Sequence, residues 1–270
     1  MTSECSSSAL SPKDALAALR SKSPLTQCIT NTVVSGFTAN VLLAIGAAPA
    51  MVDYPGEAGE FAAVADGVLI NLGTPFSDQL AATSEIPSVT RRWVLDPVAI
   101  GALSVRTKAA GQLADRKPAI IRGNASEIIA LAGRGSGGRG VDSAVGSDAA
   151  LEAATWLARC HGSVVAVSGE TDLITDGTKI ASISGGNALI TLVTGGGCTL
   201  GATMAAFLGV CDPWSAALAA SVAHKAAAAN AGKVARGPGS FAAAFLDELF
   251  VLDEASMGLD IQIQSVEVEL

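Results

Sequence analysis

The sequence lacks the features that would suit it to a membrane or to nucleic acid. Half of its 270 residues are hydrophobic and the mean hydropathy is +0.45, yet no apolar run approaches the ~18 uninterrupted residues that a membrane-spanning helix needs. The longest apolar runs, 41–49 and 202–211, are short and rich in Ala and Gly, which is typical of buried core. The net charge is −8 and basic residues form no run, so the positive surface of a nucleic-acid-binding protein is not expected.

Cysteine and histidine are too few and too scattered for a disulfide framework or a zinc site. The cysteines are five in number and contain no CxxC pair, and the two histidines lack the HExxH spacing. Residues 1–11 are polar and contain no apolar stretch of the kind that a signal peptide requires, so the cytoplasm is the expected location. We expect this segment to be a disordered lead-in to a single domain over residues 12–270.

Short apolar segments alternate with helical ones along most of the chain. They are rich in Val, Ile and Leu without strict alternation, which is typical of a mostly parallel sheet covered by helices on both faces. Beyond residue 212 only helices are predicted, and a hairpin is predicted over 173–183 because its centre carries turn residues. Strands are predicted at 25–30, 47–52, 67–72, 93–95, 119–122, 164–167 and 188–193. In such an α/β fold, ligands bind beyond the carboxyl ends of the strands.

Three glycines and a cysteine separate the segment 188–193 from an Ala-rich helical segment. Gly195, Gly196 and Gly197 carry no Cβ, so their amides can approach a ligand closely, and the start of a helix favours an anion such as phosphate. The loop matches neither the P-loop nor the dinucleotide fingerprint, so a purely structural turn is an equal alternative. Cys198 is either a small buried hydrophobe or, at a helix N-terminus, a stabilised thiolate that acts as base or nucleophile.

Polar or otherwise distinctive residues follow several of the other predicted strands. Arg122 stands beside a Gly-Asn turn, where its forked guanidinium suits a phosphate. Asp96 before Pro97 is alternatively a turn residue, and Glu127 a first-turn helix acid. Together the set suits a small ligand with one charge-rich end, such as a phosphate with a magnesium ion. The residues expected at one rim, besides the glycine loop and Cys198, are Asn31, Asn40, Met51, Asp96, Arg122, Asn124, Glu127, Ser168 and Thr194.

Several longer segments, taken together, resemble one known family. They lie in order across residues 25–210 and are TQCITNTVVSGFTAN, GAAPAMV, DGVLINLGT, WVLDPVAIGA, IIRGNASEI, VAVSGETDLITDG and TLVTGGGCTLGA. The series resembles the hydroxyethylthiazole kinases of thiamin salvage. The resemblance implies a ribokinase-like α/β fold and a homotrimer with substrate sites near the subunit interfaces. It also implies transfer of the γ-phosphoryl group of ATP, with Mg²⁺, to the primary alcohol of 4-methyl-5-(2-hydroxyethyl)thiazole.

The same resemblance assigns roles to the rim residues. The thiazole pocket would be lined by Asn31, Met51 and Gly195. ATP would be contacted by Arg122, Ser168, Asn124 and Thr194, and Mg²⁺ would be held by Glu127 and Asp96.

The glycine loop would be the anion hole for the phosphoryl group in transfer. Cys198 falls where ribokinase-like enzymes usually carry an aspartate base, so it would lie beside the acceptor hydroxyl. Gly196 departs from the family, which commonly has threonine in a GTGC loop. Two alternatives stay open: a kinase for another small alcohol such as hydroxymethylpyrimidine, and a catalytically silent protein that binds a nucleotide or a thiamin precursor.

Overall fold

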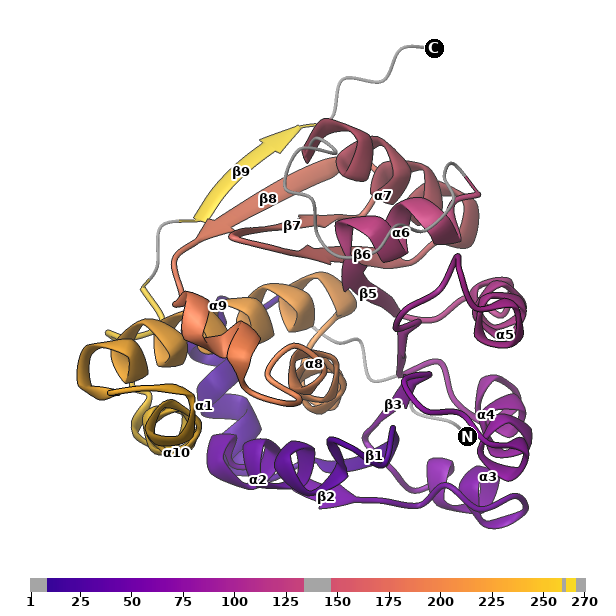
Figure 1. The fold of residues 1–270 in the computed structure, drawn as a ribbon, viewed down its shortest axis with the longest axis horizontal. Helices are drawn as coiled ribbons and strands as arrows, with labels where there is room; N and C mark the ends of the chain where they lie inside the picture. Colours follow the sequence, from indigo (N-terminus) through magenta and orange to yellow (C-terminus); the bar gives the residue numbers. More distant parts are fainter. Residues whose placement is uncertain (1–8, 134–146, 259–260, 266–270) are drawn as a thin grey trace.

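The computed structural model of the protein describes residues 9–133, 147–258 and 261–265. Most of the lead-in predicted for residues 1–11 therefore lies outside the described residues. The described part is built on one sheet with helices against both of its faces (Figure 1). Its strands are β1 (Leu25–Ile29), β2 (Ala48–Ala50), β3 (Gly67–Asn71), β4 (Trp93–Asp96), β5 (Ile120–Asn124), β6 (Val164–Ser168), β7 (Thr171–Thr175), β8 (Lys179–Ser184) and β9 (Ile261–Ser265).

The order of the strands across the sheet is β2-β1-β3-β4-β5-β6-β7-β8-β9. The pairs from β2 through β6 are parallel, and β6 to β9 are joined by antiparallel pairs. This arrangement confirms the predicted fold class and the predicted hairpin. Because β1 lies between β2 and β3, the direction of winding reverses at β1, and the carboxyl ends of β1 and β3 flank the crevice where such sheets bind ligands.

Alternate residues of the central strands face opposite layers of helices. In β3, Leu69 packs into one core cluster, whereas Val68 and Ile70 pack into another. The first layer consists of α1 (Pro12–Lys22), α2 (Ser35–Ile45), α8 (Thr199–Leu208), α9 (Pro213–Val234) and α10 (Pro238–Val251). The opposite layer consists of α3 (Glu57–Ala62), α4 (Ser77–Val89), α5 (Ser104–Ala114), α6 (Ala125–Leu131) and α7 (Ser147–His161). The residues of a strand thus alternate between two cores, as the pleat requires.

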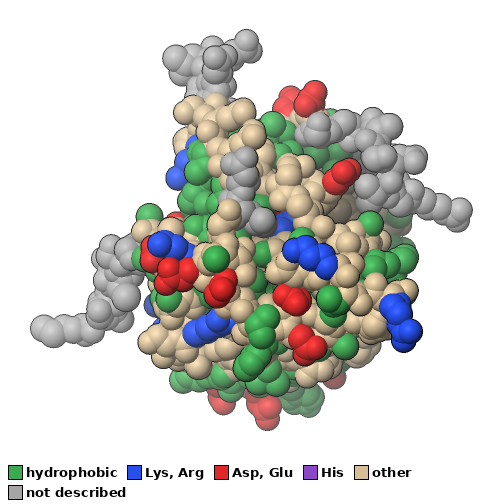
Figure 2. All heavy atoms as spheres, turned by 90° about the vertical axis from the view of Figure 1, so that its left-hand side faces the viewer, with side chains coloured by type: hydrophobic (Ala, Val, Ile, Leu, Met, Phe, Trp, Pro, Cys, Tyr) green, Lys and Arg blue, Asp and Glu red, His purple; other side chains and the backbone are tan. Residues whose placement is uncertain are grey.

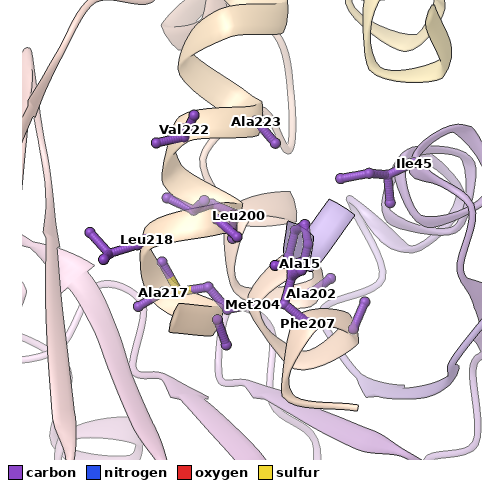
Figure 3. Packing of buried hydrophobic residues seen from close by; sticks show 14 of the residues in the cluster. Ala15, Ile45, Leu200, Ala202, Met204, Phe207, Ala217, Leu218, Val222 and Ala223 are labelled. Atoms are coloured by element: carbon purple, nitrogen blue, oxygen red, sulfur yellow. The ribbon is translucent and has the colours of Figure 1, made fainter. Parts of the chain in front are cut away.

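Helix α8 is the centre of the first layer. Every one of its residues is buried, which fits a segment that is apolar on all sides. Met204 and Phe207 belong to one buried cluster with Ala217 and Leu218 of α9, Ala15 of α1 and Ile45 of α2 (Figure 3). The outer surface of the molecule is mixed in character, since Lys and Arg side chains are interspersed with Asp and Glu on the face that Figure 2 shows.

Two predictions of secondary structure were wrong. Residues 188–193 do not form a strand; Ala188–Leu192 is a 3-10 helix, η1, whose start is capped by the Asn187 side chain accepting from the amide of Leu189 at 3.0 Å. The chain beyond residue 212 is not entirely helical, because β9 pairs with the outer edge of β8. The amide of Val193 donates to the carbonyl of Ile190 at 3.3 Å, so this segment makes helical hydrogen bonds in place of strand pairing.

Candidate functional site

Side chains at the carboxyl ends of neighbouring parallel strands are joined by hydrogen bonds. Asn31, which follows β1, donates through Nδ2 to Oδ1 of Asn71 at 2.9 Å. Asn71 ends β3 and donates through its own Nδ2 to Oδ2 of Asp96, at the end of β4, at 2.8 Å. The series continues to β5 and β6, because Arg122 donates to Asp96 Oδ2 at 3.2 Å and to Ser168 Oγ at 2.8 Å. We call these five residues the polar rim.

Asp96 and Arg122 form a buried ion pair in the middle of the polar rim. Asp96 is fully buried, and burial raises the pKa of its carboxyl group to about 6; the charge of Glu127 adds to the rise, and Arg122 and Asn71 offset only part of it. Burial lowers the pKa of Arg122, but the carboxylates of Asp96 and Glu127 together leave it above its ordinary value. Among the described residues Asp96 Oδ1 and Arg122 Nε have no hydrogen-bond partner, so each can accept or donate one further bond.

The glycine loop and the start of α8 lie directly over this ion pair. A Cβ on Gly197 would be 3.5 Å from Arg122 Nη2, and one on Gly201 would be 3.6 Å from Asp96 Oδ2. The loop amides differ in their bonding. Gly196 donates to the carbonyl of Val193 at 2.9 Å, whereas the amides of Gly195, Gly197 and Cys198 donate to nothing in the described part of the chain. An anion over Arg122 could therefore accept hydrogen bonds from the free Gly197 and Cys198 amides, whereas the Gly196 amide is already bonded to Val193.

Cys198 lies at the end of the polar rim nearest β1. Its Sγ is 3.9 Å from Nδ2 of Asn31. Burial raises the pKa of the Cys198 thiol, the charge of Asp96 raises it further, and Arg122 offsets this only in part. The shift is opposite to the lowered pKa that a position at a helix N-terminus predicts. At neutral pH the group is therefore a thiol rather than a thiolate.

Glu127 and Asn124 form the start of α6. The Asn124 side chain accepts from the amide of Glu127 at 2.9 Å, and Oε2 of Glu127 accepts from the amide of Asn124 at 2.8 Å, which is a capping box. Oε1 of Glu127 accepts from the amide of Ala99 at 2.9 Å. Ala99 has a left-handed φ of 55°, so Glu127 holds a strained loop that directly follows Asp96. Among the residues that the structure describes, no three His, Cys, Asp or Glu side chains converge as a ready metal site.

Three of the residues expected at the rim stand apart from the polar rim. Asn40 lies within α2 and is exposed. Met51 follows β2 and is half-buried against the core of the first helix layer. Thr194 is exposed and hydrogen-bonds to none of the described residues. The structure thus joins Asp96, Arg122 and Ser168 directly and joins Asn31 to them through Asn71. Asn40, Met51 and Thr194 make no hydrogen bond to the polar rim.

Two buried residues of α9, His224 and Lys225, hold segments next to the site in place. Neither was predicted from the sequence as part of the site. Lys225 donates through Nζ to the carbonyls of Gly169 and Glu170 at 2.8 and 2.7 Å, and closes the turn that follows Ser168. His224 lies 2.8 Å from Oγ1 of Thr203. No periodic signal marks either residue, because both lie in an Ala-rich helix.

His224 begins a hydrogen-bonded ladder that ends at the glycine loop. Burial lowers the pKa of His224 to about 3, with a smaller contribution from the charge of Arg122, so the ring is neutral. Oγ1 of Thr203 donates to the carbonyl of Thr199 at 3.1 Å, and Oγ1 of Thr199 donates to the carbonyl of Gly196 at 3.2 Å. Since the one hydroxyl proton of Thr203 is used in this way, His224 donates to Thr203 through Nε2.

Asn71 is the remaining member of the polar rim that the sequence did not single out. The available signal was its place at the end of an apolar segment, the same position that Asn31 occupies after β1.

Comparison with known proteins gives a consistent result. The chain matches the sequence profile of the "Hydroxyethylthiazole kinase family" over residues 16–255. It is 57% identical over 241 residues to a hydroxyethylthiazole kinase of Clavibacter sepedonicus, covering 87% of this chain and 88% of the relative. The corresponding enzyme of Corynebacterium glutamicum (strain R) is 49% identical over 260 residues, covering 93% of this chain and 97% of the relative.

Solved structures agree with the sequence relatives. The hydroxyethylthiazole kinase protein from Pyrococcus horikoshii OT3 superposes with a TM-score of 0.86 at 33% identity and covers 95% of this chain and 99% of that one. A pyridoxal kinase from Staphylococcus aureus superposes with a TM-score of 0.63 at 17% identity, covering 90% and 98%, and shares the fold alone. These neighbours confirm the ribokinase-like fold. In the described residues no helix is long and apolar enough to cross a membrane.

Proposed function

Because the chain belongs to the hydroxyethylthiazole kinase family, we propose that it transfers the γ-phosphoryl group of ATP to the primary alcohol of 4-methyl-5-(2-hydroxyethyl)thiazole. The observation that carries this proposal is the position of the free Gly197 and Cys198 amides over the buried Arg122–Asp96 pair. Phosphoryl transfer depends mainly on positioning and on neutralising the charge of the transferred group, which loop amides and a guanidinium can supply.

Arg122 is the centre of the proposed ATP site. Its Nε has no partner in the described part of the chain, and its Nη2 lies next to Gly197. The pair with Asp96 and the bond to Ser168 hold the guanidinium in one orientation, so little freedom is lost when it binds a phosphate. Asn124, Ser168 and Thr194 are proposed to complete the contacts to the nucleotide.

The residues around Asp96 fit a magnesium ion. Mg²⁺ is usually held by one or two carboxylates together with substrate phosphates and waters, and Asp96 offers a buried oxygen, Oδ1, without a partner. Both oxygens of Glu127 already accept backbone amides, so we propose that Glu127 contributes its charge and holds the loop after Asp96. When bound, the ion supplies positive charge to the phosphates of the nucleotide.

The acceptor alcohol is proposed to bind at the β1 end of the polar rim. Asn31, Met51 and Gly195 would line this pocket, and Cys198 would lie beside the hydroxyl group. Because the raised pKa keeps Cys198 protonated, we propose that it positions the alcohol instead of removing its proton. A loose transition state needs little help from a base.

A turnover assay tests the proposal directly. The purified chain is incubated with ATP, Mg²⁺ and hydroxyethylthiazole, and phosphorylated thiazole is measured by mass spectrometry, with hydroxymethylpyrimidine as the competing alcohol. A folded sample that binds nucleotide but forms no phosphorylated thiazole would overturn the kinase assignment in favour of a silent binding protein. Preferential phosphorylation of the pyrimidine would reassign the substrate.

Arg122→Ala tests the assignment of the nucleotide site. The KM for ATP is expected to rise by at least ~10-fold while the dissociation constant of the thiazole changes less, because charged hydrogen bonds are worth about 1.5–3 kcal/mol each. Arg116→Ala, which removes an exposed arginine outside the polar rim, is the matched control. Equal losses for both substrates would contradict the assignment.

We also propose that the chain assembles as a homotrimer. Exposed apolar side chains such as Leu43 (59%) and Tyr54 (62%) support an assembly that covers part of the surface. Light scattering should give a mass three times the 26.9 kDa of one chain; a monomeric mass would contradict it. The cytoplasmic location stays a prediction of the sequence.

A further inference from the structure

Asn71 links the two halves of the polar rim. It is 1% exposed and ends β3 at the point where the winding of the sheet reverses. Its Oδ1 accepts from Asn31 Nδ2 at 2.9 Å and from the amide of Gly73 at 3.0 Å, and its Nδ2 donates to Asp96 Oδ2 at 2.8 Å. One amide therefore touches both the proposed acceptor pocket and the proposed phosphoryl site.

The donors and acceptors along the rim fix the orientation of both asparagine amides. Arg122 can only donate, so Asp96 Oδ2 is an acceptor, and Asn71 must present its nitrogen to it. The oxygen of Asn71 then faces Asn31, which must donate its own nitrogen. This leaves Oδ1 of Asn31, which bonds to no described residue, as an acceptor for a donor outside the protein.

We infer that Asn71 is a positioning residue that turns the carbonyl oxygen of Asn31 toward the hydroxyl of the acceptor alcohol and holds Asn31 in register with Asp96. The inference rests on the proposed function, because it assigns Asn31 to the alcohol and Asp96 to the phosphoryl site. Asn71 itself need not touch either substrate. A displacement of the acceptor by about 1 Å can cost ~100-fold in rate, so an anchor common to both sites has a large effect.

The inference is tested with Asn71→Leu, which keeps the approximate size of the side chain and removes its three hydrogen bonds to Asn31, Gly73 and Asp96. Thiazole binding is measured by calorimetry without nucleotide, together with kcat and the melting temperature. We expect thiazole affinity to fall by about 5–10-fold and kcat by ~10-fold or more, with ATP affinity within about 2-fold of the parent. If Asn71→Leu does not fold, Asn71→Ser serves, since its shorter side chain cannot span the distance between Asn31 and Asp96.

A double variant with Asn31→Ala separates a positioning role from a general loss of structure. If Asn71 acts on the thiazole through Asn31, the double variant should bind thiazole within about 2-fold of Asn31→Ala alone. The inference would be overturned if the losses of thiazole affinity in the two single variants multiplied in the double variant. A folded Asn71→Leu with unchanged thiazole affinity and kcat would also overturn it. If Asn31→Ala itself leaves thiazole affinity unchanged, the failure lies in the proposed pocket, and the inference falls with it.

Ser163→Ala is the control for lost buried hydrogen bonding. Ser163 is 2% exposed and donates to the carbonyl of Pro118 at 2.6 Å. It directly precedes β6 and so lies at the amino-terminal ends of the strands, away from the polar rim. This variant should lower the melting temperature without changing thiazole affinity. An equal change of affinity in Ser163→Ala and Asn71→Leu would show a nonspecific effect of stability and would overturn the positioning role.

Discussion

Two neighbouring glycines of the loop should respond in opposite ways to one added methyl group. A Cβ on Gly196 would overlap the carbonyl oxygen of Ile190 and stand 3.0 Å from its side chain, whereas a Cβ on Gly197 would meet only Arg122 Nη2, at 3.5 Å. Neither glycine has a positive φ, so alanine can adopt both backbone conformations. The two variants should therefore differ because of what the added methyl group contacts, and not because of backbone strain.

The magnitudes follow from these contacts. Gly196→Ala must displace η1, and overpacking of this kind costs about 1–3 kcal/mol. At roughly 2–4 °C per kcal/mol for a chain of this size, the melting temperature should fall by about 2–12 °C. The methyl group of Gly197→Ala makes only an ordinary van der Waals contact. Because alanine reduces the conformational entropy of the unfolded chain, this variant should be stabilised by up to about 1 kcal/mol. Its methyl group would, however, crowd the free amides over Arg122. We expect kcat to fall by ~100-fold, which is the loss typically seen when one hydrogen-bond donor to the reacting anion is removed.

The assay combines calorimetric melting with kcat at saturating substrates for both variants. Gly196→Ala should lose stability but keep kcat within a few-fold, because the Gly196 amide is already bonded to Val193. Gly197→Ala should show the reverse. Gly196→Thr, which restores the residue that the family commonly carries, should be destabilised at least as much as Gly196→Ala. If Gly196→Ala melts like the parent, or Gly197→Ala retains full kcat, the described contacts of the loop do not control its stability and activity.

Three further predictions concern charge and packing. The folded state raises the pKa of Asp96 from 3.8 to about 6, so its contribution to stability is present below pH 4 and is lost as the pH rises through 6. Urea unfolding should show the parent losing about 2 kcal/mol relative to Asp96→Asn between pH 4 and 7, and a constant difference would refute this. Because the pKa of Cys198 is raised, its alkylation by iodoacetamide, followed by peptide mass spectrometry, should still accelerate above pH 9, and a plateau near pH 7 would contradict it. Arg20 donates to the carbonyls of Leu252, Phe250 and Leu249 at 2.6, 2.8 and 3.1 Å. Arg20→Met should therefore lower the free energy of unfolding in urea by about 2–4 kcal/mol and leave kcat unchanged. An unchanged free energy of unfolding would show that these bonds do not stabilise the fold.

The sequence predicted the parallel strands and the residues at their carboxyl ends because both depend on local patterns. Asn31, Asp96, Arg122 and Ser168 each follow or end an apolar segment, and the sheet necessarily brings such positions to one rim. Asn71 was missed because it falls inside the predicted strand 67–72 and not after its end. Local patterns therefore indicate which residues reach the rim, and hydrogen-bond partners decide which of them act together.

The errors arose where distant contacts decide the structure. An apolar run such as 188–193 does not distinguish a strand from a helical turn. Strand β9 was missed because it pairs with β8 across more than 70 residues of chain. The roles of His224 and Lys225 are likewise set by what α9 packs against, which an Ala-rich sequence does not reveal. Glu127 was recognised as acidic, but its two backbone contacts could be seen only in the folded loop.

The complete burial of α8 has a consequence for how the chain is made. α8 packs against β1, β3 and β4, and α9 packs against α8 and α1. The apolar side chains Cys28, Leu69 and Val94 therefore lack the cover of α8 until the residues up to 208 have left the ribosome. At about 5–20 residues per second, the first strands wait on the order of 10–40 s for the helices that complete their core. The early strands thus expose part of their hydrophobic face until α8, more than 100 residues further along the chain than β4, has been made.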